Sequence, residues 1–237
     1  AHALLTRTPP TLRCGTPFQG FHAETDLVDR ARAAALALKD GVLPVQGPPG
    51  TGKTSLGARM IRALLREGTR VGVIATGHKV MANLLEEVCA ADRDDPDTDF
   101  RALHVSGQEY GDDRVEVVKG SGAGDAARAA AEEDGAPFNL IAGTAWYWCR
   151  DDLVEDLDVL VVDEAGQFSL ANAVAVAPAA RNLILLGDPR QLNQPQKGVH
   201  PPGTELSVLE HLAGDDKILT PDRGLFLGET WRMRPEI

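Results

Sequence analysis

The sequence predicts an α/β fold with a mostly parallel sheet and helices on both of its faces. The first observation is that short apolar runs typical of strands alternate with longer stretches typical of helices. The second is that runs such as residues 159–162 and 183–186 are apolar throughout, which is typical of strands buried on both faces. The third is a glycine-rich segment, residues 47–54, between a predicted strand and a predicted helix.

The predicted elements alternate along most of the chain. Residues 25–40, rich in Ala and Leu, are expected to form a helix that ends at Gly41. Strands are predicted at residues 42–46, 70–75, 140–143, 159–162 and 183–186, and helices at about 53–67, 79–91 and 168–177. Right-handed crossovers between such elements make neighbouring strands parallel.

Two segments depart from this alternation. Residues 1–24 contain several Pro and Gly residues and are expected to form an irregular lead-in that packs on the surface. Residues 92–137, with an acidic cluster and an Ala-rich part, are interpreted as an insertion or an extended edge of the domain. Their acidic residues suit a solvated surface, or a small accessory element over a ligand groove.

Composition narrows the class of protein. A chain of 237 residues with 43% hydrophobic residues suits one large domain, or one domain with an insertion. The net charge of −11 does not favour nucleic-acid binding in general, although a local basic groove remains compatible with it. Because the first residue is not Met, we expect the chain to be part of a longer protein.

Cysteine usage and hydropathy indicate a cytoplasmic protein. None of the three cysteines forms a Cys-x-x-Cys pair, which argues against a disulfide framework and a zinc site. The histidines show no ligand spacing. No apolar run approaches the roughly 20 residues that span a bilayer, and no signal peptide is evident, so no membrane partner is expected.

Residues 47–54 read Gly-Pro-Pro-Gly-Thr-Gly-Lys-Thr and match a phosphate-binding loop. Glycines let successive backbone N–H groups point into one concavity at a helix N-terminus. Lys53 is suited to reach the β- and γ-phosphates, and the Thr54 hydroxyl is suited to ligate Mg²⁺. The predicted ATP-binding residues here are Gly47, Pro48, Pro49, Gly50, Thr51, Gly52, Lys53 and Thr54. A simple glycine-rich turn is the alternative.

Two carboxylates follow the apolar run at 159–162. Asp163 is placed to hold Mg²⁺ beside Thr54, and Glu164 is placed to activate the attacking water. An apolar run followed by Asp-Glu is weak evidence alone, but beside a phosphate-binding loop it indicates an Mg²⁺-dependent P-loop NTPase.

Further polar residues follow other predicted strands. Gln191, in Gly-Asp-Pro-Arg-Gln-Leu, is suited to touch the γ-phosphate, and Arg232 to stabilise transition-state charge. The segments at Thr76, His78 and Lys79 and at Thr144 and Trp146 are suited to nucleic-acid contacts. The alternative for His78 and Lys79 is a solvated helix start.

The aromatic residues 146–148 allow two interpretations. Aromatic side chains beside a strand end can stack on bases. An aromatic cluster is more often part of a hydrophobic core.

The five motifs at residues 47–54, 76, 163–167, 187–192 and 231–235 occur in the order found in superfamily 1 helicases, which this chain resembles over about residues 25–237. The group includes the helicase of nonsense-mediated RNA decay and the nuclease-helicases of DNA replication. The similarity extends to bacterial proteins that carry a RecB-like nuclease domain upstream, although no nuclease residues are present here.

The resemblance implies a RecA-like domain, the first of two, that couples Mg-ATP hydrolysis to 5′ to 3′ movement on single-stranded nucleic acid, DNA being favoured over RNA. It implies that Lys53, Glu164, Gln191 and Arg232 are catalytic and that Trp231 lies near the adenine. The second RecA-like domain, and a possible nuclease domain, are expected in the longer protein.

One departure and two alternative functions stand beside this resemblance. The family has an adenine-reading glutamine upstream of the loop, where this chain has Asp29 or Arg30; Gln19 lies too far upstream. An AAA+ remodelling ATPase would share the loop and the Asp-Glu pair, but would want a polar sensor where Gly187 and Asp188 stand. A non-catalytic nucleotide-sensing module would not need Glu164.

Overall fold

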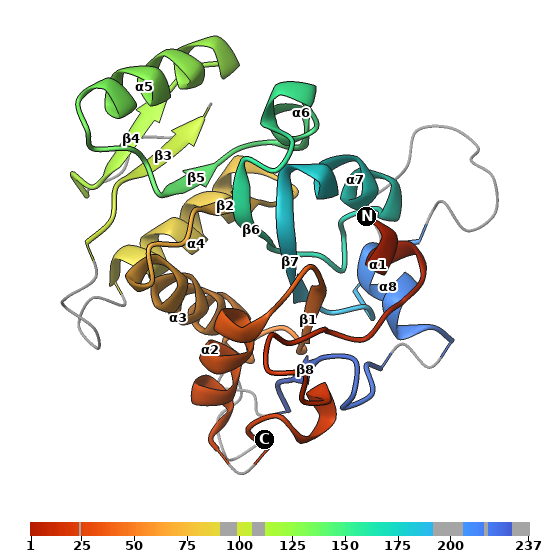
Figure 1. The fold of residues 1–237 in the computed structure, drawn as a ribbon. Helices are drawn as coiled ribbons and strands as arrows, with labels where there is room; N and C mark the ends of the chain where they lie inside the picture. Colours follow the sequence, from red (N-terminus) through yellow and green to blue (C-terminus); the bar gives the residue numbers. More distant parts are fainter. Residues whose placement is uncertain (24, 91–98, 106–111, 192–205, 216–217, 229–237) are drawn as a thin grey trace.

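A computed structural model describes residues 1–23, 25–90, 99–105, 112–191, 206–215 and 218–228. Within these residues the strands form one eight-stranded parallel sheet in the order β4-β3-β5-β2-β6-β7-β1-β8 (Figure 1). The α/β fold class with a parallel sheet is therefore confirmed. In the described residues, no helix is long and apolar enough to cross a membrane.

The strands are β1 (Val42–Gln46), β2 (Val71–Ile74), β3 (Ala102–Val105), β4 (Val115–Val118), β5 (Leu140–Ala142), β6 (Leu157–Val162), β7 (Ala180–Gly187) and β8 (Leu225–Phe226). The α-helices are α1 (His2–Leu5), α2 (Leu27–Ala37), α3 (Lys53–Arg66), α4 (His78–Ala90), α5 (Ser121–Glu133), α6 (Ala145–Trp148), α7 (Leu170–Val176) and α8 (Val208–Ala213). Short 3₁₀ turns are η1 (Phe18–Gly20), η3 (Asp151–Leu153) and η4 (Ala177–Ala179).

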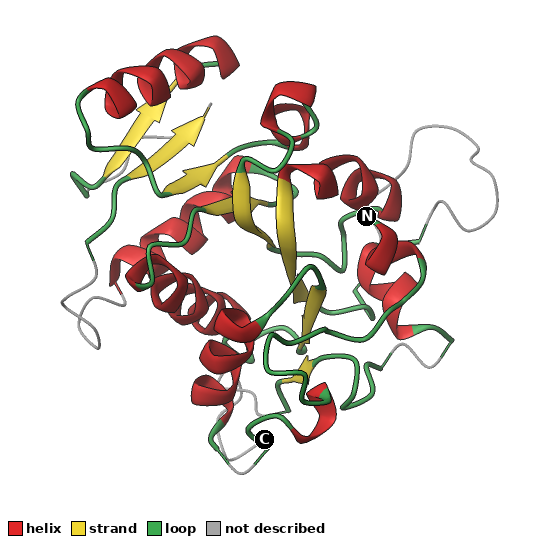
Figure 2. Cartoon of the chain, viewed as in Figure 1, coloured by secondary structure: helices red, strands yellow, loops and turns green. Residues whose placement is uncertain are grey.

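Helices cover both faces of the sheet, as the apolar strands predict (Figure 2). Helices α2, α3 and α4 pack on one face, and α1, α5, α6, α7 and α8 contribute to the hydrophobic cluster on the other. Alternate residues of one strand serve the two clusters: Val161 belongs to the first and Leu160 to the second. This double burial explains why the strands read as unbroken apolar runs.

The predicted central strands and helices are present, with small differences at their ends. Strand β1 has the predicted bounds, whereas β6 begins two residues earlier and β7 extends in both directions from residues 183–186. Strand β5 ends at Ala142, one residue earlier than predicted, and a Cβ at Gly143 would lie 2.6 Å from Cδ1 of the Tyr147 ring. The sequence did not predict the short elements α1, α6, α8 and β8.

The segment 92–137 extends the sheet at one edge. Strand β3 pairs in parallel with β5, and β4 pairs in parallel with β3. Helix α5, formed from the Ala-rich part, packs against β3 and β4. The described residues of this segment thus add strands β3 and β4 and helix α5 at one edge of the sheet.

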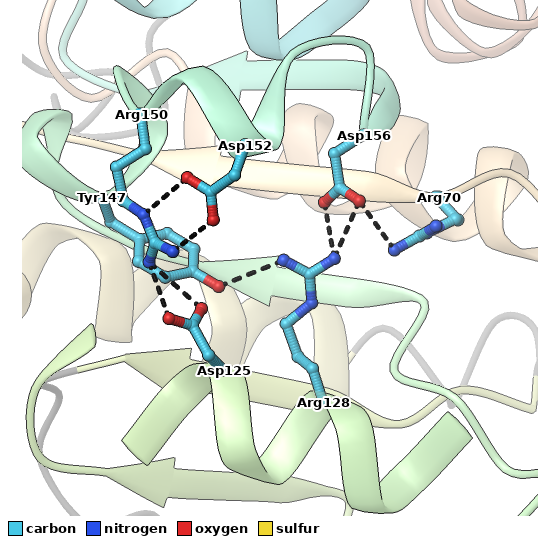
Figure 3. A network of polar contacts seen from close by, with 7 residues as sticks. All are labelled: Arg70, Asp125, Arg128, Tyr147, Arg150, Asp152 and Asp156. Carbon is cyan, nitrogen blue, oxygen red and sulfur yellow. Dashed lines mark hydrogen bonds and ion pairs between the residues drawn. The ribbon is translucent and has the colours of Figure 1, made fainter. Parts of the chain in front are cut away.

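A polar network ties this edge to the centre of the domain. It comprises Arg70, Asp125, Arg128, Tyr147, Arg150, Asp152 and Asp156 (Figure 3). Arg128 of α5 pairs with Asp156, which precedes β6, at 2.7 Å, and donates to the Tyr147 hydroxyl at 3.2 Å. The Arg128 and Asp156 side chains are only 12% and 15% exposed, so this pair is well shielded from water.

Most of residues 1–23 are exposed, and a few buried apolar side chains hold this segment on the rest of the domain. Leu4, Leu12, Phe18 and Phe21 are buried, and Leu12 forms an antiparallel bridge with Leu38. The backbone is largely irregular, but its apolar side chains fill both clusters, since burying them removes them from water.

Candidate functional site

The loop at residues 47–52 connects β1 to α3, and its glycines are required for two different reasons. Gly50 and Gly52 have φ of +83° and +80°, a region that other residues rarely adopt. Gly47 has no such φ, but a Cβ there would lie 2.5 Å from Thr51 Oγ1 and 2.9 Å from Leu227 Cβ. The Thr51 hydroxyl donates to the Pro48 carbonyl at 2.8 Å and closes the loop.

The Lys53 side chain lies over this loop. Its Nζ donates to the Gly47 carbonyl at 2.7 Å and to the Pro48 carbonyl at 3.0 Å, and the residue is only 8% exposed. The ammonium group is therefore held at the concavity where the loop would receive phosphates.

The predicted carboxylates lie at the carboxyl end of β6, in a turn anchored to both neighbouring strands. The Asp163 N–H donates to the Ile74 carbonyl of β2, and the Ala165 N–H donates to the Leu186 carbonyl of β7, both at 2.8 Å. Glu164 between them has φ of +54°, a left-handed conformation that is uncommon for this residue type and that recurs at functional sites.

Asp163 and Glu164 differ in their electrostatic environments. Burial raises the pKa of Asp163 to about 6, while a hydrogen bond from the Glu164 N–H opposes this rise and the charge of Glu164 adds to it. Oε2 of Glu164 is buried and has no hydrogen-bond partner among the residues that the structure describes. A buried, unpaired carboxylate oxygen is costly, and a water or ligand at the site would satisfy it.

The turns after β6 and β7 pack backbone against backbone. A Cβ at Gly166 would lie 2.0 Å from the Asp188 carbonyl oxygen, and a Cβ at Gly187 would lie 2.6 Å from the Gly166 nitrogen. This close approach lets the Gln167 side chain donate to Gln191 Oε1 at 3.4 Å. The sequence analysis did not assign Gln167 a role, although it stands in the Asp-Glu-Ala-Gly-Gln segment.

One cavity of about 1390 Å³ brings the loop, Glu164 and Gln191 together. It is lined by Asp26, Leu27, Val28, Pro49, Gly50, Thr51, Gly52, Lys53, Thr54, Ser55, Leu56, Arg59, Glu87, Glu164, Gln191, Phe226, Leu227 and Gly228. Its volume exceeds that of most small-molecule pockets, so a nucleotide would leave part of it unfilled.

This cavity is also lined by residues that the sequence did not predict. Val28 of α2 and Phe226 of β8 line it, and Phe226 is 50% exposed there. Neither Asp29 nor Arg30 lines the cavity. The Arg30 guanidinium turns away and donates to the Phe21 carbonyl at 2.9 Å. No sequence signal marked Phe226, because a two-residue strand has no detectable periodicity.

The residues predicted to contact nucleic acid gather outside this cavity. Thr76 and His78 follow β2, and Thr144 and Trp146 follow β5, its neighbour in the sheet. Lys79 is exposed beside His78. The carboxyl ends of parallel strands meet at one edge, so these residues lie along the same edge as the nucleotide cavity.

The aromatic cluster divides between its two interpretations. Trp146 is 86% exposed, whereas Tyr147 and Trp148 are 3% and 1% exposed. Trp148 Nε1 donates to the Val73 carbonyl at 3.3 Å, which fixes the short helix α6 on the sheet. Of these three side chains, Trp146 alone is exposed enough to stack on a base.

The residues present fit a magnesium ion that keeps most of its waters. The described residues contain no group of three or more His, Cys, Asp or Glu side chains that could hold a metal. Mg²⁺ is commonly bound by one or two protein oxygens together with substrate phosphates. Thr54 lines the cavity, and Asp163, whose carboxylate is buried, is not part of its lining; these two residues carry the oxygens that would hold the ion. Trp231 and Arg232 lie outside the described residues.

The parallel sheet, the glycine-rich loop before α3 and the carboxylates after β6 define a P-loop NTPase. The chain belongs to the family described as an AAA domain, which its residues 30–196 match. No curated protein matches the sequence.

Solved structures similar to this chain include two nucleic-acid-associated proteins. The Arterivirus nonstructural protein 10 (helicase) in complex with DNA has 16% identity and a TM-score of 0.42, covering 73% of this chain and 33% of its own. The Sulfolobus solfataricus SWI2/SNF2 ATPase core in complex with dsDNA has 17% identity and a TM-score of 0.43, and the match covers 76% of this chain and 33% of that structure's chain. The chain thus spans about a third of the length of these structures.

Proposed function

We propose that this chain is the ATP-binding and hydrolysing motor domain of a helicase. It would couple Mg-ATP hydrolysis to movement on single-stranded nucleic acid, with DNA favoured over RNA. The observation that carries the proposal is that the phosphate-binding loop, Glu164 and Gln191 line one cavity, at the edge where Thr76 and Thr144 also lie.

The proposed chemistry assigns a role to each group in the cavity. The loop N–H groups and Lys53 bind the phosphates, and Mg²⁺, held by Thr54 and Asp163, supplies charge neutralisation. Glu164 accepts a proton from the attacking water, and its unpaired Oε2 supports this role. Arg232, and Trp231 at the base, complete the proposed site.

Gln191 is proposed to link nucleotide state to the nucleic-acid edge. It lines the nucleotide cavity and accepts a hydrogen bond from Gln167, which follows the Asp163–Glu164 turn. A γ-phosphate in contact with Gln191 would therefore influence both turns. We further propose that a second RecA-like domain and a nuclease domain belong to the full protein.

An AAA+ remodelling ATPase remains the alternative enzyme. Such an enzyme would have a polar sensor residue at the position of Gly187 and Asp188. Here Gly187 packs directly on the Gly166 backbone, and the buried Asp188 carboxylate accepts a hydrogen bond from the Arg190 N–H. The Gly187 backbone and the Asp188 side chain are thus both engaged in closing the turn. This packing favours the helicase proposal over the sensor-based one.

The test is Mg²⁺-dependent ATP hydrolysis by the longest natural chain that contains this segment, with and without single-stranded DNA or RNA. We expect strong stimulation by one polymer, and loss of hydrolysis in Glu164→Gln with nucleotide binding retained. Glu86→Gln, the same change at an exposed position of α4 outside the cavity lining, is the matched control.

Each outcome separates the proposed functions. Hydrolysis without stimulation by either polymer would favour a remodelling ATPase. Full hydrolysis in Glu164→Gln would contradict the role assigned to this residue. Binding of ATP with no hydrolysis in any preparation would favour the nucleotide-sensing alternative.

A further inference from the structure

Two histidines form a direct contact at the carboxyl edge of the sheet. Nδ1 of His78, the first residue of α4, lies 3.3 Å from Nε2 of His104 in β3. Their ring centroids are 5.5 Å apart, with an angle of 39° between the planes. His104 is fully buried, whereas His78 is partly exposed. The buried ring of His104 therefore lies against the ring of His78, which reaches the surface of the domain.

The position of this pair is defined by the sheet. His104 pairs in register with Ala142 of β5, two residues before Thr144. His78 follows the end of β2, which is the other neighbour of β5. Neither histidine lines the nucleotide cavity. His78 therefore belongs to one of the two segments that carry the proposed nucleic-acid contacts, and His104 lies on the strand beside the other.

A hydrogen bond between two ring nitrogens requires exactly one proton between them. Burial is the main cause that lowers the pKa of His104 to about 4, so that ring is neutral near pH 7. If Nε2–H of His104 donates, Nδ1 of His78 accepts and the proton of a neutral His78 must lie on Nε2. Donation by Nε2–H of His104 thus determines that the proton of a neutral His78 is on Nε2 and not on Nδ1.

A phosphate oxygen accepts hydrogen bonds and donates none at neutral pH, so it requires an N–H at the other side of His78. The groups beside His78 do not oppose an anion: Lys79 is basic, and residues 75–77 and 143–144 at the ends of β2 and β5 carry no charge. Nε2–H of His78 is accordingly suited to donate to a phosphate.

We propose that His104 is a positioning residue that holds the proton of His78 on Nε2, from which His78 donates to a backbone phosphate of a bound single strand. This inference rests on the proposed function, because it requires that single strands bind at this edge. It assigns a role to a buried histidine that touches neither nucleotide nor nucleic acid.

The first test is the affinity of the whole chain for fluorescein-labelled oligo(dT), measured by anisotropy at low salt. We expect His78→Ala and His104→Leu each to weaken binding about three- to tenfold, and the double variant to weaken it no further, since both remove one interaction. His104→Gln, whose side-chain amide N–H takes the place of Nε2–H, should restore most of the affinity. His2→Ala, an exposed histidine of α1, is the matched control.

The second test observes the proton directly. Long-range ¹H–¹⁵N spectra of the histidine rings, recorded at pH 7 with and without oligo(dT), distinguish the two neutral forms of each ring. We expect neutral His104 with its proton on Nε2, and His78 with a proton on Nε2 in the complex. This measurement does not depend on the folding of any variant.

The outcomes separate this inference from the function on which it rests. If the longest natural chain that contains this segment binds neither oligo(dT) nor oligo(U), both are overturned. Wild-type binding with unchanged affinity in His78→Ala, or additive losses in the double variant, would overturn only the positioning role. So would a His78 ring that carries its proton on Nδ1 alone when the strand is bound.

Discussion

Replacing Asp163 by Asn should stabilise the protein near neutral pH while removing hydrolysis. Asp163 is 2% exposed, and burial raises its pKa from the usual 3.8 to about 6. At 1.36 kcal/mol per pKa unit, keeping this carboxylate ionised in the folded protein costs about 3 kcal/mol above pH 6. The cost is absent below pH 4, where the group is protonated in both the folded and unfolded states. Stability is therefore lost as the pH rises between these values.

The assay is thermal unfolding of the wild type and Asp163→Asn at pH 4.5 and pH 8, in EDTA and without nucleotide. The asparagine amide brings its own cost, which does not depend on pH, so the informative quantity is the change in the Tm difference between the two conditions. The linkage relation gives a change of about 2 kcal/mol in favour of the variant, or roughly 4–8 °C for a domain of this size.

The reasoning would be refuted by a Tm difference that is the same at both pH values. Such a result would mean that the carboxylate is hydrated or paired in the folded protein and pays no burial cost. Saturating Mg-ATP should reverse the order of stability, because only the wild type gains the full binding energy of the metal complex.

Three further predictions concern binding and stability. Lys53→Ala should remove most nucleotide binding, since a charged contact to phosphate is lost; unchanged affinity for a fluorescent ATP analogue would contradict the loop assignment. Phe226 is a half-exposed aromatic residue of the cavity lining and is therefore suited to stack on the base, so Phe226→Ala should weaken binding of nucleoside triphosphates about three- to tenfold while leaving inorganic tripolyphosphate unaffected; equal losses for both would exclude a base contact. Asp156→Asn should lower the free energy of unfolding by about 2 kcal/mol, because the shielded Arg128 loses its charged partner, whereas Asp152→Asn, at a 62% exposed side chain, should cost under about 1 kcal/mol; equal urea midpoints for both would contradict this ranking.

The nucleotide site was predictable where its residues are close together in the chain. The loop spacing requires only that a strand precede Gly47 and a helix follow Lys53, and both are local features. Asp163 and Glu164 were predicted because a strand end places them at a known edge of the sheet. Gln167 and Phe226 were not assigned, because their roles arise from contacts with Gln191 and with the cavity rather than from any spacing.

The sequence by itself determined the alternation of strands and helices, the phosphate-binding loop and the acidic strand end, because each of these depends only on the order and spacing of neighbouring residues. Only the tertiary structure decided that residues 102–105 and 115–118 join the same sheet, that the Asp163 carboxylate is buried away from water, and that the His104 and His78 rings are in contact. These features depend on segments distant in the chain approaching one another. Periodicity shows which face of a strand is apolar, but strand pairing and side-chain burial are set by the packing of the whole domain.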